Sequence, residues 1–356
     1  MSQLFYDPDK TFDENFDHGP WLDATEYVPN PTLGQTLLGL PINVPFGIPA
    51  GSLPNSKFVK AAFDRGYDVV TYKTQRNVSF PVNDFPNVIP IDVDGDVTLE
   101  KAEAGLMMAD SWPEDPKLNT ITNSFGNPSR GPEFWVDDMK EAVAAAHEGQ
   151  MMIASVVGTI QKGFSDEDYW QDFADTAKLA KSTGAHAIEV NLSCPNVASE
   201  GIICYTPEAV REICKRTKAA IGTTPLVIKV GYYSPEQYEL LDQVISDVDQ
   251  YIAAVCAINT IPAAVRKQDG SQALPGKGRL KSGLCGAGIK WAGLDMVKRL
   301  DDIRDAAGYQ FEIIGVGGVM TQEDFMQYRE AGADAVQSAT GSMWNPGLAK
   351  QIIESR

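Results

Sequence analysis

Short apolar segments alternate along the chain with longer segments of helical periodicity. Eight of the apolar segments are bounded by Gly, Asn or Lys, which is typical of strands buried on both faces. These predicted strands cover residues 45–50, 67–73, 151–157, 185–190, 226–230, 253–259, 311–316 and 333–338. Because such strands need helices on both sides of the sheet, the pattern predicts an α/β fold.

The segments between the strands carry helix signals. Residues 166–182 repeat apolar positions at three- and four-residue spacings. Pro207 occupies a first-turn position ahead of residues 209–221. Thr321 followed by Asp324 forms part of a capping box at the start of another helix. Eight strands alternating with helices favour a (β/α)8 TIM barrel, and an open doubly wound sheet is the alternative.

Two stretches depart from the regular alternation. Residues 75–132, between the second strand and its helix, form a long insert rich in Pro, Asn and Asp. A long insert without secondary structure of its own is typical of a lid or site loop, and a plain surface excursion is the alternative. Residues 1–43 form an N-terminal extension that we expect to wrap the bottom or edge of the barrel. Residues 44–356 are predicted to be the barrel domain.

Composition narrows the class of protein. The chain has 356 residues and a formal net charge of −18, and no basic segment is interleaved with aromatics. A nucleic-acid or anionic-membrane partner is therefore not expected. No apolar stretch reaches ~18 residues and the N-terminus lacks a signal-peptide pattern, which favours the cytoplasm. The five cysteines include no C-x-x-C pair and the three histidines are scattered, so no metal site is predicted.

Two turns of small residues indicate a phosphate site. Gly317 and Gly318 follow the seventh predicted strand, and Ala339 and Thr340 follow the eighth. Loops at these two places commonly bind phosphate in barrel enzymes, because small residues let backbone N–H groups approach the ligand. Either turn alone is weak evidence and is often only a tight turn. Together they favour a cofactor that carries a phosphate.

Charged and carboxamide side chains lie at the strand ends. Lys73 and Lys229 close the second and fifth strands. A buried lysine needs an anionic partner, such as a cofactor that becomes anionic on reduction, and snorkelling to solvent is the alternative. Five carboxamides in strand-end or loop positions indicate a polar cage for a flat, amide-containing ligand, although each alone is a common turn residue. They are Asn123, Asn127, Asn191, Asn196 and Asn259.

A thiol lies between two of these carboxamides. Cys194 stands between Asn191 and Asn196 in the segment that follows the fourth predicted strand. Buried cysteines are usually small apolar packing residues. The polar neighbours of Cys194 favour a second interpretation, in which a thiol with a pKa near ~8.5 acts as a general base. Cys204 is the weaker candidate for the same role.

Seven motifs in this order resemble the dihydroorotate dehydrogenase family, and specifically its soluble class 1. The motifs are Ala50-Gly51-Ser52, Tyr72-Lys73-Thr74, Asn123-Ser124-Phe125-Gly126, Asn191-Leu192-Ser193-Cys194-Pro195-Asn196, Ile228-Lys229, Ile258-Asn259-Thr260 and Gly315-Val316-Gly317-Gly318. In the membrane-linked class, a serine replaces the cysteine and a membrane-associating segment precedes the barrel. The resemblance implies an FMN-bearing (β/α)8 barrel that oxidises dihydroorotate to orotate.

The resemblance also assigns roles to individual residues. Those expected to hold FMN are Ala50, Gly51, Lys73, Thr74, Asn191, Lys229, Asn259, Gly286, Gly317, Gly318, Ala339 and Thr340. Those expected to frame the pyrimidine are Lys73, Asn123, Phe125, Gly126, Asn127, Asn191, Asn196, Asn259 and Thr260. Cys194 would remove the proton from C5, with Lys73 as the second catalytic residue, while hydride passes from C6 to flavin N5.

The chain departs from the family pattern in places that bear on the substrate. Asn127-Pro128-Ser129 replaces the usual Leu-Pro-Asn type of sequence, and residues 259–260 and 268–271 resemble dihydropyrimidine dehydrogenase as closely. A neutral dihydropyrimidine such as dihydrouracil is therefore one alternative substrate, and a non-catalytic flavin-binding barrel is a second alternative. Class 1 membership implies a homodimer that uses fumarate, or a chain paired with a subunit that passes electrons to NAD.

Overall fold

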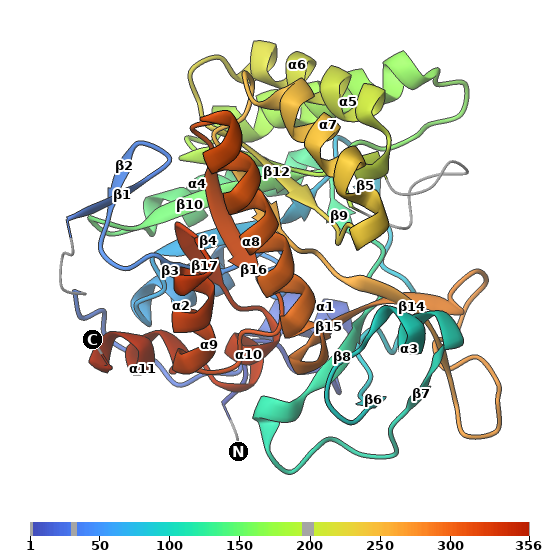
Figure 1. Ribbon diagram of the computed structural model, residues 1–356. Coiled ribbons are helices and arrows are strands. Elements are labelled where there is room, and N and C mark those ends of the chain that lie inside the picture. Colours follow the sequence, from blue (N-terminus) through green and yellow to red (C-terminus); the bar gives the residue numbers. More distant parts are fainter. Residues whose placement is uncertain (1–2, 30–33, 194–202, 356) are drawn as a thin grey trace.

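The computed structural model describes residues 3–29, 34–193 and 203–355, and its centre is a closed barrel of eight parallel strands (Figure 1). Around the barrel the strand order is β10-β11-β12-β13-β16-β17-β3-β4. The strands are β3 (Phe46–Ile48), β4 (Val69–Gln75), β10 (Met151–Val156), β11 (Ala187–Asn191), β12 (Leu226–Val230), β13 (Ala254–Ala257), β16 (Glu312–Val316) and β17 (Ala335–Gln337). Each lies where the sequence predicts a strand, so the (β/α)8 barrel is confirmed and the open sheet is excluded.

Helices cover the outside of this barrel (Figure 1). They are α2 (Ser56–Asp64), α4 (Pro132–Ala144), α5 (Asp166–Ser182), α6 (Pro207–Ile221), α7 (Tyr238–Val248), α8 (Lys290–Ala307), α9 (Gln322–Glu330), α10 (Thr340–Trp344) and α11 (Leu348–Glu354). The predicted helix signals are confirmed: α5 has the predicted bounds and α6 begins at Pro207. Thr321 and Asp324 satisfy both halves of the capping box of α9.

Alternate residues of the barrel strands fill its interior, as the two-residue period of a strand requires. The apolar ones are Val69, Met151, Ile153, Ala187, Val227, Ala254, Cys256, Ile314, Val316 and Ala335. The hairpin of β1 (Gln35–Leu37) and β2 (Leu40–Ile42) packs into the same cluster through Leu37 and Ile42. This part of the N-terminal extension therefore closes the bottom of the barrel.

The insert after β4 carries secondary structure of its own, so the expectation of a structureless stretch is wrong. It contains β5 (Ser79–Phe80), β6 (Ile91–Asp92), α3 (Leu99–Ala104), β7 (Leu106–Met108), β8 (Thr120–Asn123) and β9 (Ser129–Arg130). Three of these strands join β14 (Ile261–Arg266) and β15 (Lys281–Gly286) in a sheet of order β6-β7-β14-β15-β8, beside the barrel in Figure 1. The strands are two to four residues long, too short to show an alternating pattern.

Residues 3–29 do not all lie at the bottom of the barrel. The short helix α1 (Phe12–His18) packs beside residues that follow β3, where the Asn55 side chain donates a hydrogen bond to the Phe16 carbonyl at 2.8 Å. Phe5 N donates to the Met343 carbonyl at 3.2 Å. The extension therefore reaches both ends of the barrel. The apolar residues of positions 5–16 pack into one core cluster, and those of positions 37–42 pack into another.

Candidate active site

A cavity of about 590 Å³ opens at the carboxyl ends of the barrel strands. Twelve of the residues predicted from the sequence line it together. They are Ala50, Gly51, Asn123, Asn191, Lys229, Asn259, Thr260, Gly286, Gly317, Gly318, Ala339 and Thr340. They come from the ends of six barrel strands and from β8 and β15 of the insert sheet. The carboxyl ends of parallel strands are where barrel enzymes place their active sites.

Lys229 brings a buried positive charge to the floor of this cavity. Its side chain is 6% exposed, and Nζ donates a hydrogen bond to Cys256 Sγ at 3.2 Å. The Cys256 thiol donates in turn to Gln337 Oε1, and Gln337 Nε2 donates to Thr71 Oγ1 at 2.9 Å. These neutral partners hold the ammonium group in place, and the Glu189 carboxylate, which hydrogen-bonds the Cys256 thiol, is a nearby negative charge.

Neither Lys229 nor Lys73 takes part in any ion pair that the described part of the chain forms. The sequence-based alternative of snorkelling is wrong for both lysines, since both are buried. A buried ammonium group without a carboxylate partner is costly unless an anion meets it. The two lysines are therefore suited to an anionic ligand.

Two carboxamides meet across the cavity. Asn259 Nδ2 donates a hydrogen bond to Asn191 Oδ1 at 3.2 Å, and the same oxygen accepts from the backbone N–H of Ser193 at 3.2 Å. The pair fixes Asn191 Oδ1 as an acceptor, which leaves its Nδ2 as a donor for a ligand. Asn123 reaches the same cavity from β8. The predicted polar cage thus has three of its five members in one place.

The turn after β16 requires glycine for steric reasons. Gly318 has φ +65°, and a Cβ there would lie 2.6 Å from Lys290 N. Gly317 has φ +132°, a backbone conformation that side chains rarely adopt. Both glycines line the cavity, where the backbone N–H groups of such a turn suit a phosphate group.

Lys73 lies just beside the cavity rather than on its wall. Its Nζ donates a hydrogen bond to the Gly51 carbonyl at 3.0 Å and stands 4.8 Å from the centre of the Phe125 ring. Burial lowers the pKa of Lys73 to about 8, because removal from water penalises the charged form. Lys73 therefore connects the Gly51 wall to the loop that contains Phe125.

Four other predicted residues are not part of the cavity wall. The Thr74 hydroxyl lies 3.0 Å from the Ser155 hydroxyl, and Phe125 lines an adjoining apolar cavity of about 350 Å³. Gly126 packs on Asn83, and the carbonyl of Asn127 accepts from Arg76 Nε at 2.9 Å. These residues shape or support the loop around the cavity. Cys194 and Asn196 lie outside the described residues.

The weaker base candidate, Cys204, is fully buried. Burial raises the pKa of the Cys204 thiol to about 12, because the thiolate loses its solvation. A thiol with such a pKa is a poor base near neutrality. The burial of Cys204 therefore does not support it as the general base in place of Cys194.

Comparisons with known proteins agree with this geometry. The sequence model of the family described as dihydroorotate dehydrogenase matches residues 113–355. The chain is 35% identical over 361 residues to dihydroorotate dehydrogenase of Dictyostelium discoideum, covering 98% of this chain and 96% of the relative. It is also 35% identical over 185 residues to the catalytic subunit of dihydroorotate dehydrogenase B (NAD(+)) of Thermodesulfovibrio yellowstonii, covering 51% of this chain and 57% of the relative.

The chain belongs to the dihydroorotate dehydrogenase family. Members of this family are oxidoreductases that act on CH–CH bonds, and the sequence-based assignment is confirmed. In the described ranges, every helix is too short or too polar to cross a bilayer.

Sequence reasoning missed several residues of this family member's cavity. Glu189, Cys285 and Gln337 line it, although none of the three was predicted to belong to the site. Glu189 and Gln337 stand two residues beyond Ala187 and Ala335, on the inward face of β11 and β17. The two-residue period could have identified both. Cys285 belongs to β15, whose pairing with β8 was not predictable from the local sequence.

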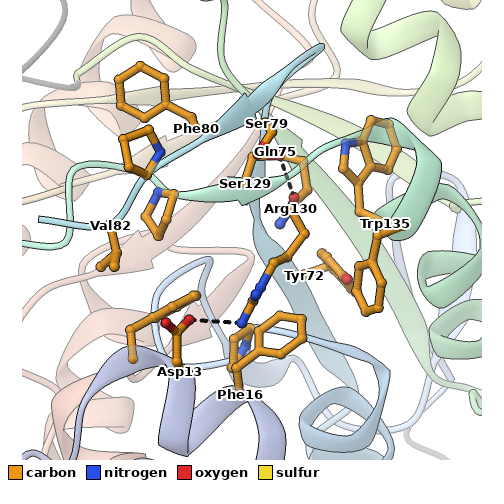
Figure 2. Close-up of a pocket in the computed structure, with 15 residues that line it drawn as sticks. Asp13, Phe16, Tyr72, Gln75, Ser79, Phe80, Val82, Ser129, Arg130 and Trp135 are labelled. Atoms are coloured by element: carbon orange, nitrogen blue, oxygen red, sulfur yellow. Dashed lines mark hydrogen bonds and ion pairs between the residues drawn. The ribbon is translucent and has the colours of Figure 1, made fainter.

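A second cavity of about 740 Å³ lies between α1 and the insert of this dihydroorotate dehydrogenase homologue (Figure 2). Phe16, Phe80 and Trp135 are among the aromatic residues around it. Arg130 and Asp13 form an ion pair across it at 2.8 Å, drawn as a dashed line in Figure 2. This cavity shares no lining residue with the first, so it is a separate feature of the same end of the molecule.

Proposed function

We propose that the protein is a class 1 dihydroorotate dehydrogenase that uses FMN to oxidise dihydroorotate to orotate. The observation that supports this proposal most strongly is the meeting of a buried Lys229, a carboxamide pair and a glycine turn in one cavity. These are the groups that a flavin phosphate, an anionic flavin and a pyrimidine ring need.

The residues present fit FMN. The turn at Gly317 and Gly318 and the N-terminal turn of α10 at Thr340 would hold the phosphate through backbone N–H groups, since both turns line the cavity. Lys229 would stabilise negative charge on the flavin ring, because its neutral partners leave its own charge intact. FMN, when bound, supplies the hydride acceptor for C6 of the substrate at its N5.

The chain itself supplies the acid–base chemistry and the orientation. Asn123, Asn191 and Asn259 would bind the amide edges of the pyrimidine by donor and acceptor contacts. Cys194, in the segment that follows Asn191, would remove the proton from C5, which is acidified by the adjacent carbonyl group. Lys73 would orient the substrate from the other side of the Gly51 wall.

A charge argument favours dihydroorotate over dihydrouracil. Dihydroorotate carries a carboxylate and dihydrouracil does not, and Lys73 is a buried cation without a carboxylate partner in the described part of the chain. The altered residue Asn127 stands outside the cavity wall and uses its carbonyl to bind Arg76. Residues 268–271 form a turn far along the β14–β15 hairpin, where Gln268 contacts the Met108 carbonyl. These two departures therefore give little support to a neutral substrate, and Asn259 and Thr260, which line the cavity, resemble both families equally.

We also propose fumarate as the electron acceptor and a homodimer as the assembly. The relative that aligns over nearly the whole chain is named without a partner subunit. The NAD-linked relative from Thermodesulfovibrio yellowstonii aligns over about half of this chain. Electron transfer to NAD through a second subunit is the alternative.

The test is a substrate comparison on purified protein. Yellow protein with flavin absorbance that is bleached by dihydroorotate, but not by dihydrouracil, and reoxidised by fumarate would support the proposal. If dihydrouracil alone bleaches the flavin, the substrate is dihydrouracil and not dihydroorotate. Colourless protein that does not take up added FMN would contradict the whole proposal.

A further inference from the structure

An aromatic strap crosses one side of the candidate active site. We use this name for residues 5–16, whose rings Phe5, Tyr6, Phe12 and Phe16 are all at least nine-tenths buried. The strap belongs to the N-terminal extension, and no motif of the family resemblance falls within it. The barrel motifs shared with the family therefore do not account for the position of the strap.

Two rings of the strap enclose Phe125 of the candidate substrate loop. The centre of the Tyr6 ring lies 5.5 Å from that of Phe125 at an interplanar angle of 82°. Phe12 approaches Phe125 at 6.1 Å and 61°. Both are edge-to-face contacts, the geometry that aromatic pairs prefer. Phe125 is two residues from Asn123, so the strap limits the movement of the loop that brings Asn123 to the cavity.

Phe12 and Phe125 also flank the ammonium group of Lys73. Lys73 Nζ lies 4.8 Å from the centre of the Phe125 ring and 6.0 Å from that of Phe12. The Gly51 carbonyl accepts a hydrogen bond from the third side at 3.0 Å. Ring faces attract a cation without neutralising it, so these contacts fix the direction of Lys73 and keep its charge available.

The strap is anchored at several points, so it is a built part of the site. Asp13 pairs with Arg130 of β9 at 2.8 Å, and the Arg130 guanidinium stands 4.5 Å over the Phe16 ring (Figure 2). The Asn15 side chain accepts from Asp7 N at 2.8 Å and donates to the Thr11 carbonyl at 2.9 Å. The Arg130 contacts hold the strap on the insert, the Asn15 bonds hold its own turns together, and the Asn55 side chain after β3 ties it to the barrel by donating to the Phe16 carbonyl at 2.8 Å.

We propose that Phe12 is a positioning residue for substrate binding, acting through Phe125 and Lys73. The inference rests on the proposed function, because it takes the loop from Asn123 to Asn127 as part of the substrate site. Phe12 is not part of the cavity wall, and Lys73 is the predicted FMN residue that its ring approaches. Its effect must therefore appear in substrate affinity rather than in flavin content.

The experiment compares three variants of the full-length flavin-loaded protein. Phe12→Leu removes the ring, Phe12→Tyr keeps it, and Phe311→Leu removes a buried ring at the opposite end of the barrel. The readouts are KM and kcat for dihydroorotate, the Kd for orotate from the flavin difference spectrum, FMN content and Tm.

We expect Phe12→Leu to raise KM and the orotate Kd about three- to tenfold, as the loss of one or two aromatic contacts implies. Its kcat should change less than twofold, with FMN content unchanged. Phe12→Tyr should stay within twofold of the parent. Phe311→Leu should lower Tm without changing KM. Unchanged KM and orotate Kd in Phe12→Leu, or an equal change in Phe311→Leu, would overturn the inference.

Failure of the proposed function gives a different result. If the parent protein oxidises dihydrouracil instead, the same comparison is made with that substrate. If the parent protein oxidises neither, hydrogen exchange of the amides in residues 121–130 tests the strap without turnover. Faster exchange there in Phe12→Leu than in Phe311→Leu supports the strap, and equal exchange refutes it.

Discussion

Lys229 Nζ donates a hydrogen bond to Cys256 Sγ at 3.2 Å inside the barrel. Burial raises the pKa of the Cys256 thiol to about 12 although the nearby Lys229 charge lowers it, so the thiol stays neutral at physiological pH. The lysine is thus oriented by a partner that does not cancel its charge. This arrangement is what a residue that stabilises an anionic cofactor requires.

Replacing Lys229 should therefore weaken flavin binding. Lys229→Ala is expected to raise the Kd for FMN at least tenfold and to leave the purified protein partly colourless, because the buried cation near the ring is lost. Flavin fluorescence on dilution measures the Kd. Lys215→Ala, which removes an exposed lysine of α6, is the control with the same charge change. Full FMN retention and activity in Lys229→Ala would refute the role.

Replacing Cys194 should separate cofactor binding from turnover. Cys194→Ser is expected to keep FMN but to lose about 10²- to 10⁴-fold in kcat near neutral pH, because an alcohol is a much weaker base than a thiol. Stopped-flow reduction of the flavin by dihydroorotate measures this step directly. Cys204→Ser serves as the comparison, and its activity should be near that of the parent. Normal turnover in Cys194→Ser would assign the base to another group.

The lowered pKa of Lys73 gives a pH prediction. Because that pKa is about 8 in the free protein, the ammonium form predominates below pH 8 and is lost above it. If the charged form binds the substrate, kcat/KM should fall as the pH rises through about 8. In Lys73→Arg the side chain stays charged, so this decrease should move to higher pH. A pH profile of Lys73→Arg that matches the parent profile would assign the decrease to another group.

The same shift has a consequence for stability. The folded pKa of Lys73 lies below its unfolded value of about 10.5, so the unfolded state binds more protons between pH 8 and 10.5. The free energy of unfolding should therefore increase with pH in that interval. Below pH 8 Lys73 is charged in the folded state, and the full cost of burying that charge lowers the free energy of unfolding. Lys73→Met should therefore raise the Tm at pH 7 while it lowers activity. A lower Tm for Lys73→Met would show that Lys73 contacts outweigh its desolvation.

A glycine substitution tests the turn after β16. Gly318→Ala is expected to lower Tm and FMN affinity together, because φ is +65° and the new Cβ would lie 2.6 Å from Lys290 N. Gly308→Ala is the matched control, since Gly308 also has positive φ, +72°, but has nothing within 4 Å of the Cβ position. Gly308→Ala should lower the free energy of unfolding by about 1 kcal/mol and leave FMN binding unchanged. Equal flavin loss in both variants would contradict the phosphate role.

Several features of the fold were predictable because they are local. The eight barrel strands are apolar runs with clear boundaries, and α5 and α9 carry their own capping signals. The cavity residues at these strand ends followed from the barrel topology, since all parallel strands end on one face. Lys229 and Asn191 illustrate this, because each closes a strand that the sequence shows on its own.

The rest depends on contacts between distant segments. Phe12 reaches Phe125 and Lys73 only because the strap folds over the insert. No periodic pattern in the sequence predicts that contact. Cys285 enters the cavity because β15 pairs with β8. β8 has only four residues and β15 contains two glycines, so neither sequence specifies its partner.

The pairing of Asn123 with Gly283 also sets an order for assembly. The ribosome makes β6, β7 and β8 well before it makes the β14–β15 hairpin that joins them into one sheet. Until that hairpin emerges, the insert of a growing chain has unpaired strand edges and one wall of the site is missing. A chain cut short before β15 would therefore retain most of the barrel strands but could not bring Asn123 to its place.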